Sequence, residues 1–459
     1  MFLKRVVVIL GLLGSLTACS TLPQVGNWLQ PPDVAHIKFA NAHGALSAKR
    51  SATIVAQLRA KSGDLDILDK QIALEQTIVG TPLVVGNRVT LLEDGPQTYG
   101  AMFAAIRLAR DHINVESYII ESDEVGQQFA DLLMERQRHG VQVNLIYDSF
   151  GAWGTDKAYF KQLKDAGVQV VEFNPVNPLL AGGDWKPNHR DHRKLLIVDG
   201  AIAFLGGINI SSVYSSGSSI KGSHPPKNDS TPWRDTDVQI EGPVVAEFQK
   251  LFMDTWAKQK GPTLEGHQYF PLVAAKGNDI VRAIGSTPDD PFSLIYLTLI
   301  AAIENAEKQV YITNAYFVPD PQLIDSLLAA AARGVDVRMV LPGKSDSATV
   351  YYAGRSHYTS LLEGGVKIYE RLNALLHSKT VLIDGVWSCV GSSNLDWRSA
   401  LDNDEVNAVI LGRDMGSKMQ AAFARDIAAS ESIELENWQR RPLLLRLKEL
   451  SARFFGRLL

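Results

Sequence analysis

The chain has 459 residues, of which 46% are hydrophobic and 21% charged, and its formal net charge at pH 7 is -4. This length and apolar fraction suffice for two ordinary domains and exclude a fibrous or largely disordered protein. The acidic balance argues against a nucleic-acid coat, which would need a net basic face. We therefore expect a globular protein with no nucleic-acid partner.

The amino terminus carries a targeting signal. Lys4 and Arg5 precede an apolar run from Val6 to Leu13, which is too short to span a bilayer as a permanent helix. Small residues then lead to Cys19. We interpret residues 1–18 as a bacterial secretory signal peptide.

Residues 19–85 carry no chemical signal. Their first part, to about Pro32, is polar and proline-marked, as suits a tether. Helix-forming stretches follow from Ser47 to Lys61 and from Leu65 to Glu75. We expect a tether and a helical segment and assign them no function.

Cys389 is the only cysteine left after Cys19, so no disulfide can form within the mature chain, and its apolar neighbours indicate a buried core residue.

From Gly86 the chain divides into two halves, residues 86–262 and 263–428, with the same order of elements. Each half is expected to run strand, helix, strand, helix, strand and then a hairpin, which is typical of α/β units around a mixed sheet. We therefore predict an α/β fold of two pseudo-symmetric halves, each a mixed sheet flanked by helices, packed face to face. The matched stretches are 112–119 with 309–316, 138–145 with 332–339, and 165–170 with 363–368.

A short polar pattern, H-x-K-x4-D, occurs once in each half. A glycine and, three places later, an asparagine follow both copies at identical spacing. At background frequencies one such pattern should appear only about 0.02 times in a chain of this length, so two copies by chance are improbable. The first copy is His192, Lys194, Asp199, Gly206 and Asn209, and the second is His377, Lys379, Asp384, Gly391 and Asn394.

Each pattern is predicted to fold as a β-hairpin, because an Asp-Gly pair lies between two apolar runs. Residues two apart on a strand share a face, so the histidine and lysine of each copy point the same way. Reversal at the turn places His192 beside Gly207 and Asn209, and His377 beside Ser393 and Asn394. Each copy thus becomes a compact cluster of imidazole, ammonium and carboxamide groups.

Such clusters suit phosphoryl chemistry. Lysine is a point charge for phosphate oxygens, asparagine is a donor and glycine lets the backbone approach a ligand. Two histidines can exchange a phosphodiester, because one attacks phosphorus to form a covalent intermediate and the other protonates the departing alkoxide. The lysines and asparagines would neutralise the growing charge, so we expect no metal and no cofactor. The predicted phosphate-binding residues are Asn209, Asn394, Gly207 and Ser393.

The two motif aspartates lie an odd number of residues from the lysine, so an ideal strand points them away from the histidine. We expect Asp199 and Asp384 to fix the hairpin through local hydrogen bonds. Acids further along each half are better partners for the histidine Nδ1–H: Asp237 in the first half and Glu405 in the second. Solvated charges are the alternative for both.

Two further segments stand outside the repeat. Residues 211–232, rich in Ser, Gly, Pro and Lys, have no counterpart after the second motif, and would form a lid near the site or a plain surface loop. Residues 429–459 are basic and amphipathic: on a helical wheel Leu443, Leu447, Leu450, Phe454 and Leu458 share one face, and Arg446, Arg453 and Arg457 another. This pattern is typical of an interfacial helix on anionic lipid, with a helix docked on the protein's own core as the alternative.

With both motifs intact, the chain resembles the phospholipase D superfamily from about Gly86 to Ala428. Its second half is most similar to bacterial cardiolipin synthases, in Asn314–Asp320, Leu341–Asp346 and Gly391–Ser399. The resemblance implies transfer of a phosphatidyl group from one phosphatidylglycerol to the glycerol of another, with release of glycerol, and His192 as nucleophile. It implies anionic phospholipids as partners, with phosphatidylethanolamine as a further donor. The catalytic residues that it implies are His192, Lys194, Asp199, His377, Lys379 and Asp384.

Leu16-Thr17-Ala18-Cys19 resembles the lipobox of bacterial lipoproteins, which implies cleavage before Cys19 and lipidation of its thiol. Ser20 resembles the outer-membrane sorting rule. We expect a lipid-anchored protein of the cell envelope that faces the periplasm, at the outer rather than the inner membrane. Many cardiolipin synthases have two amino-terminal membrane helices in this place, and an ordinary signal peptide is the alternative.

Three other functions compete with the synthase. A phospholipase D hydrolase differs only in using water as acceptor, and the residues do not separate the two. A nuclease predicts a basic groove and no lipid anchor, the reverse of this sequence. A non-catalytic scaffold would be expected to have lost a motif histidine or lysine, and none is missing.

Overall fold

The computed structural model describes residues 22, 37–62, 65, 67–177, 186–216 and 231–459. The signal peptide, Cys19 and most of the 211–232 insert lie outside the described residues. The predictions made for those segments are therefore not tested by the fold.

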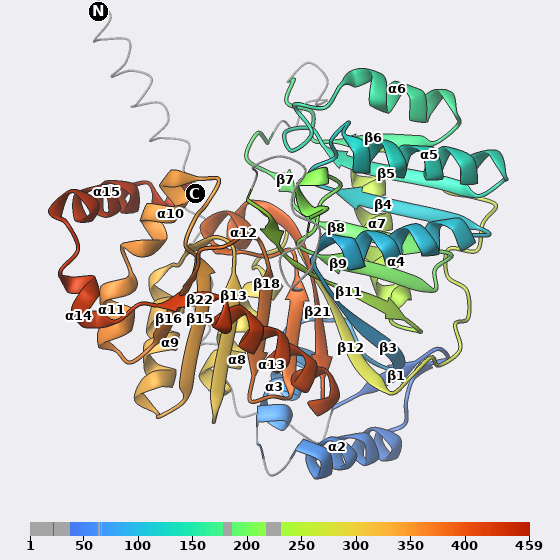
Figure 1. Cartoon of the computed structure of the whole chain (residues 1–459). Helices are drawn as coiled ribbons and strands as arrows, with labels where there is room; N and C mark the ends of the chain where they lie inside the picture. The colour runs from blue at the N-terminus through green and yellow to red at the C-terminus, as the bar shows by residue number, and fades with distance from the viewer. Residues whose placement is uncertain (1–21, 23–36, 63–64, 66, 178–185, 217–230) are drawn as a thin grey trace, which may run out of the picture.

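The first half is a mixed β-sheet with helices on its outer face (Figure 1). Three helices, α4 (Asp94–Leu108), α5 (Glu124–Arg138) and α6 (Lys157–Asp165), alternate with its parallel strands. The carboxylates of Asp123 and Asp156 accept backbone N–H groups and so begin α5 and α6. In sheet order the strands are β6 (Gln169–Phe173), β5 (Gln142–Asp148), β4 (His112–Ser117), β8 (Lys194–Val198), β9 (Ile202–Gly206), β11 (Thr236–Glu241) and β3 (Leu83–Glu93).

The second half repeats this order. Its outer face is covered by α8 (Leu294–Asn305), α9 (Pro321–Ala332), α10 (Ala348–Arg355) and α11 (Tyr358–Glu363). In sheet order its strands are β22 (Ser430–Ser432), β16 (Lys367–Arg371), β15 (Asp336–Pro342), β13 (Gln309–Asn314), β18 (Lys379–Ile383), β19 (Trp387–Gly391), β21 (Asn403–Leu411) and β12 (Asp279–Ser286).

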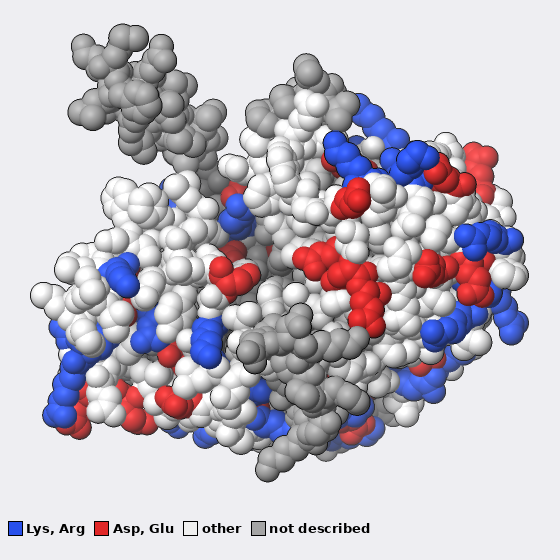
Figure 2. All heavy atoms as spheres, turned by 45° about the horizontal axis from the view of Figure 1, so that its top comes forward, with Lys and Arg blue, Asp and Glu red and all other residues white. Residues whose placement is uncertain are grey.

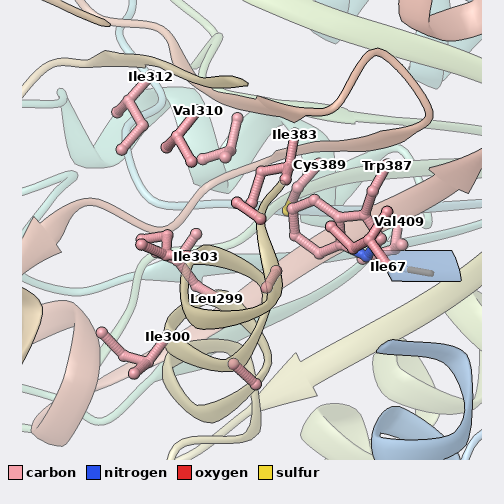
Figure 3. Packing of buried hydrophobic residues seen from close by; sticks show 14 of the residues in the cluster. Ile67, Leu299, Ile300, Ile303, Val310, Ile312, Ile383, Trp387, Cys389 and Val409 are labelled. Atoms are coloured by element: carbon pink, nitrogen blue, oxygen red, sulfur yellow. The ribbon is translucent and has the colours of Figure 1, made fainter. Parts of the chain in front are cut away.

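The helices expected near residues 47–61 and 65–75 are present as α2 (Ala48–Ser62) and α3 (Ile67–Ile78). Helix α3 lies against α8, so α8 is buried between a helix and a sheet and is apolar almost throughout. Figure 3 shows this core, in which Leu299 of α8, Trp387 and Cys389 lie together. The Trp387 Nε1–H donates to Glu75 of α3 at 2.8 Å. Cys389 is the buried core residue that its neighbours predicted.

The two halves meet in two ways. Strands β3 and β12 pair and join the sheets edge to edge. The inner faces of the sheets also pack on one another, with Leu195, Leu205 and Val238 of the first half against Leu382 and Val406 of the second. The predicted face-to-face arrangement of two α/β halves is confirmed. Helices α7 (Val245–Lys258) and α13 (Arg413–Ala428) contribute to this inner core.

The chain ends in α14 (Leu435–Gln439), α15 (Leu443–Phe454) and a short turn, Gly456–Leu458, which pack beside α10, α11 and α12 (Trp397–Leu401). The remaining short strands are β1 (Phe39–Asn41), β2 (Gly44–Ala45), β7 (Arg190–Asp191), β10 (Trp233–Arg234), β14 (Phe317–Val318), β17 (Leu375–Leu376) and β20 (Leu395–Asp396). In the part of the chain that the structure describes, no helix combines the length and apolar character needed to cross a bilayer.

Candidate active site

Both motifs fold as the predicted hairpins. Leu195 pairs with Leu205 across the first and Thr380 with Val390 across the second. The turn residues have positive φ angles, 52° at Asp199 and 53° at Asp384, and each is followed by a glycine that also has a positive φ. Two successive residues of this kind form the tight turn that matches the twist of paired strands.

Each motif histidine directly follows a short strand that pairs with the other half of the molecule. Strand β7, just before His192, runs parallel to the start of β21, and the His192 N–H donates to Asp404 O at 3.0 Å. Strand β17, just before His377, runs parallel to β10, and the His377 N–H donates to Arg234 O at 2.7 Å. The backbone thus binds each motif to the opposite half.

The side chains repeat this exchange. The Nδ1 atom of His192 lies 3.0 Å from Oε1 of Glu405, a second-half residue. The Nδ1 atom of His377 lies 2.7 Å from Oδ2 of Asp235, a first-half residue. All four side chains are buried. Because an ionised carboxylate only accepts hydrogen bonds, Nδ1 of each histidine carries the proton and Nε2 remains available for chemistry.

The charge states of these pairs follow from their surroundings. Burial raises the pKa of the Glu405 carboxyl, but His192, the hydrogen bond and Lys194 outweigh it and bring the pKa to about 2. Burial lowers the pKa of His192 to about 4, against the opposing effect of Glu405. His192 is therefore a neutral imidazole beside a carboxylate at neutral pH. Asp235 likewise has a lowered pKa, because His377 and Lys379 outweigh its burial.

The motif lysines lie inside the same site. Lys194 Nζ donates to His192 O at 2.5 Å, and Lys379 Nζ donates to His377 O. Burial lowers the pKa of Lys194 to about 7 and that of Lys379 to about 8. The charge of Lys379 also lowers the pKa of His192, and that of Lys194 lowers the pKa of His377. The two motifs therefore share one electrostatic site.

The motif aspartates point away from the histidines, as strand geometry predicts, but their hydrogen bonds are not local. Each aspartate lies at the end of the first hairpin strand. Its carboxylate accepts backbone N–H groups at the start of the strand that pairs with that hairpin strand in the sheet. Asp199 accepts from Arg110, Asp111 and His112, and Asp384 accepts from Glu307, Lys308 and Gln309, at 2.7–3.1 Å. They anchor each hairpin to β4 or β13.

Asp237 does not orient a histidine, which corrects the sequence prediction. Its Oδ1 accepts the Ile208 N–H at 3.1 Å, beside the hairpin glycines. Burial and the neighbouring Asp235 raise its pKa well above the ordinary value, so it is a neutral acid. The residue that meets His377 is Asp235, two positions earlier on the chain. Glu405 does bind a histidine, but the one in the opposite half.

The predicted phosphate ligands are placed differently from one another. The Asn209 carboxamide is engaged within the protein, since its Oδ1 accepts the Ile119 N–H at 3.1 Å and its Nδ2 donates to Tyr214 Oη at 2.9 Å. A side chain at Gly207 would collide with Asp235, so this glycine admits the acid rather than a ligand.

In the second half, Asn394 lies with Lys379 and Ser393 in the wall of one pocket. The Asn394 Oδ1 is buried and has no hydrogen-bond partner within the described protein. The Ser393 N–H instead donates to Asn407 Oδ1 at 3.4 Å. Of the four predicted ligands, Asn394 has the most unoccupied hydrogen-bonding capacity.

Aromatic rings that the sequence did not single out surround the histidines. Tyr118 meets His192 edge-on at 5.1 Å between ring centroids, and Tyr316, one position later in the repeat, meets His377 at 6.1 Å. Each lysine also lies near the matching tyrosine ring, Lys194 near Tyr118 and Lys379 near Tyr316. In the match of residues 112–119 with 309–316, Tyr118 falls opposite Ala315 and Tyr316 opposite Ile119, so the two tyrosines come from adjacent positions of the repeat.

Two more rings touch only His377. The ring centroids of Tyr214, within the first-half insert, and Trp233, directly after it, lie 5.8 Å and 5.3 Å from that of His377. They make the two histidine environments unequal. Among the described residues, no group of three or more His, Cys, Asp or Glu side chains is arranged to hold a metal ion.

Comparisons with known proteins show which family the chain belongs to. Residues 102–216 and 299–427 match a family model described as "Cardiolipin synthase, PLD-like domain". The chain is 35% identical over 381 residues to the cardiolipin synthase of Geobacillus kaustophilus, which covers 82% of this chain and 74% of that protein. It is 33% identical over 406 residues to the cardiolipin synthase of Alkalihalophilus pseudofirmus, covering 88% of this chain and 78% of that protein.

The chain belongs to the cardiolipin synthase family. As a member of this family it is a phosphatidyltransferase of the phospholipase D superfamily.

The fold of this cardiolipin synthase homologue also occurs in a more distant protein. The crystal structure of phosphatidylserine synthase from Haemophilus influenzae superposes with a TM-score of 0.62 at 14% identity, covering 84% of this chain and 99% of that one. This likeness concerns the fold of the two halves.

Proposed function

We propose that this chain makes cardiolipin by transferring the phosphatidyl group of one phosphatidylglycerol to the terminal hydroxyl of a second, with release of glycerol. One observation carries the proposal. Two buried histidines, each with Nδ1 on a carboxylate of the opposite half, keep Nε2 available in one site that also holds two lysines. One histidine attacks phosphorus. The second donates a proton to the leaving alcohol and accepts one from the entering alcohol.

In the first step, Nε2 of His192 attacks phosphorus and the bond from phosphorus to the glycerol oxygen breaks. His377 acts here as an imidazolium, with Nδ1–H on Asp235 and a second proton on Nε2, and it gives the Nε2 proton to that oxygen, so that free glycerol leaves. The pKa of about 4 keeps His192 neutral, as an attacking nitrogen must be. Lys194 and Lys379 oppose the charge that grows on the non-bridging oxygens, in a site that excludes most water.

In the second step, His377 takes the proton of the glycerol hydroxyl of the second phosphatidylglycerol. That oxygen attacks phosphorus, the bond from phosphorus to His192 breaks, and cardiolipin forms. Atoms balance without water. Asp235 and Glu405 hold the two rings and stabilise each imidazolium as it forms.

The exposed apolar face of α15 supports a bilayer substrate. The apolar side chains of its helical face are exposed, whereas Glu449 and Ala452 on the other side are buried. The helix therefore rests on α10 with the side that carries Glu449 and Ala452 and presents the leucines of its opposite face outward. Basic residues flank that face, which suits an anionic bilayer surface. The exposed residues are Leu443, Leu444, Leu447, Leu450 and Phe454, and the flanking basic residues include Arg446, Lys448 and Arg453.

The proposed lipid anchor at Cys19 fits the same orientation. Leu22, three residues later, lies in the wall of the pocket that contains Lys379 and Asn394. Three residues span at most about 11 Å, so an anchor at Cys19 would hold this pocket close to the lipid surface. We propose a periplasm-facing protein, held by this anchor at the outer membrane.

The product test is direct. Purified full-length protein in vesicles of phosphatidylglycerol should release cardiolipin and glycerol in equal amounts, with phosphatidylethanolamine tested as an added donor. Phosphatidic acid as the sole lipid product would replace the synthase with a phospholipase D hydrolase. Vesicles of phosphatidylcholine alone contain neither the phosphatidylglycerol donor nor its glycerol acceptor. They are the negative control and should yield no cardiolipin.

A further inference from the structure

The connection from β5 to α6, residues 149–156, presents two large aromatic side chains to solvent. Trp153 is 70% exposed and Phe150 is 56% exposed. Neither belongs to the proposed catalytic site. Isolated apolar residues on a surface are ordinary, but two exposed aromatic rings three positions apart on one short loop are not.

The loop is held firmly, so its exposure is built into the fold. The Asp148 carboxylate accepts the Phe150 N–H at 2.8 Å and the Gly151 N–H at 2.9 Å. The Thr155 hydroxyl donates to the carbonyl oxygen of Ile120. A side chain at Gly151 would collide with the backbone of Tyr118. The loop therefore lies directly on this site tyrosine, which follows the end of β4.

Lysines border the aromatic tips. Lys157, Lys161 and Lys164 are exposed at helical spacing on one face of α6, while Tyr159, Phe160 and Leu163 pack inward. The three lysines and Trp153 line one open hollow. Amphipathic rings beside long basic side chains are the composition of a membrane-interface anchor, in which Trp inserts among headgroups and lysines reach the phosphates.

The internal repeat places this loop opposite α15. In the second half the corresponding connection leads from β15 to α10, and α15 lies on α10. The exposed apolar face of α15 therefore lies beside α10, the helix that follows the matching connection of the second half. Figure 1 shows α6 and α15 on the same upper side of the molecule, one on each half, and Figure 2 turns that side toward the viewer.

We propose that the aromatic loop, residues 149–156 with the lysine face of α6, is a second membrane anchor that inserts into an anionic phospholipid bilayer on the first-half side of the active-site mouth. Together with α15 it holds the molecule at two points, one on each half. The same Asp148 that holds the loop also accepts the Asp191 N–H at 2.9 Å, next to His192. The Asp148 carboxylate thus connects the loop to the backbone of the residue that precedes His192. The inference rests on the proposed action on bilayer phospholipids.

Fluorescence quenching tests the insertion in the full-length protein. Vesicles of phosphatidylglycerol with brominated acyl chains should quench tryptophan fluorescence, and Trp153→Phe should remove most of the quenched component. Trp438→Phe is the matched control, because Trp438 is buried in the fold, and should leave the quenching unchanged. Equal quenching of the Trp153→Phe and Trp438→Phe proteins would overturn the proposal.

An activity comparison gives a second readout. Phe150→Ser with Trp153→Ser should reduce turnover in phosphatidylglycerol vesicles roughly tenfold, as loss of partial burial of two rings predicts, and leave turnover in detergent micelles unchanged. Leu108→Ser is the control. Leu108 is 75% exposed, but it precedes β4 and so lies at the amino-terminal end of the parallel strands, opposite the end from which the aromatic loop emerges. An equal loss in micelles would contradict membrane insertion. Because quenching needs no turnover, failure of the synthase proposal would leave that result intact.

Discussion

The Nδ1 atom of His377 lies 2.7 Å from the Oδ2 atom of Asp235, although the two residues belong to different halves of the chain. The His192–Glu405 pair repeats the relationship in the opposite sense. A half that folded alone would thus hold a histidine without its acid and an acid without its histidine. The internal repeat makes one site from two incomplete ones.

This exchange predicts the effect of neutral amide substitutions. Asp235→Asn and Glu405→Gln should each lower kcat for cardiolipin formation by about 10²- to 10⁴-fold, because the histidine loses the acceptor that fixes its tautomer. Steady-state assays with phosphatidylglycerol measure this. Asp237→Asn is the matched control two residues away, and since Asp237 is already neutral it should stay within a few-fold of wild type. A large loss in Asp237→Asn with none in Asp235→Asn would reverse our assignment.

The motif aspartates should matter for stability. Asp384→Ala leaves three backbone N–H groups without their acceptor and puts alanine at a positive φ, so the free energy of unfolding should fall by about 3 kcal/mol or more. Denaturant unfolding measures it. Asp384→Asn keeps one acceptor oxygen and tolerates the backbone angle, so it should lose less and remain active once folded. An Asp384→Asn protein as stable as wild type but inactive would place the aspartate in the chemistry.

The lysines set the alkaline side of the pH profile. An ammonium group is needed opposite the phosphate, and Lys194, with a pKa of about 7, loses its proton as the pH rises through that value. Therefore kcat/KM should fall above about pH 7. Lys194→Arg keeps its charge at all these pH values, so its decline should move to about 8, where Lys379 titrates. A profile that does not move in Lys194→Arg would show that another group controls it.

Helix α15 should carry part of the membrane affinity. Leu447→Glu with Leu450→Glu adds two charges to an exposed apolar face without touching the core, so binding to phosphatidylglycerol vesicles should weaken at least tenfold. Cosedimentation of the full-length Cys19→Ser protein, which lacks the proposed anchor, measures this. The control, Glu431→Gln with Glu434→Gln, alters exposed acids before the helix and should not weaken binding. Unchanged binding by the leucine variants would remove α15 from the interface.

The repeat made much of the fold predictable from sequence. The order of elements along the chain, both hairpins and their turns follow from local signals: Asp-Gly between apolar runs and a period of two along the strands. Helices α2 and α3 were also indicated, but their place against α8 was not, because a buried face against another helix has no signal beyond apolar residues.

The pairing of acids with histidines across the halves could not be deduced in this way. Sequence reasoning placed Asp237 beside a histidine, and the structure places Asp235 there. Hairpin registers were available in principle: Gly206 pairs with Asp237 and Gly391 with Asn407, so Asp235 is the counterpart of Glu405. Which histidine each acid meets depends on how the two sheets pack, a tertiary choice that no local pattern encodes.

One measurement tests the central claim most directly. Phosphatidylglycerol labelled with ³²P, mixed with enzyme and quenched rapidly in an alkaline denaturant that preserves the acid-labile bond between phosphorus and histidine, should leave label on the protein in wild type. Label should accumulate in His377→Ala, which attacks slowly and cannot complete the transfer. His192→Ala should carry no label and make no cardiolipin. Label on His192→Ala, or cardiolipin from either variant at the wild-type rate, would contradict a single site in which His192 is the nucleophile and His377 its acid and base.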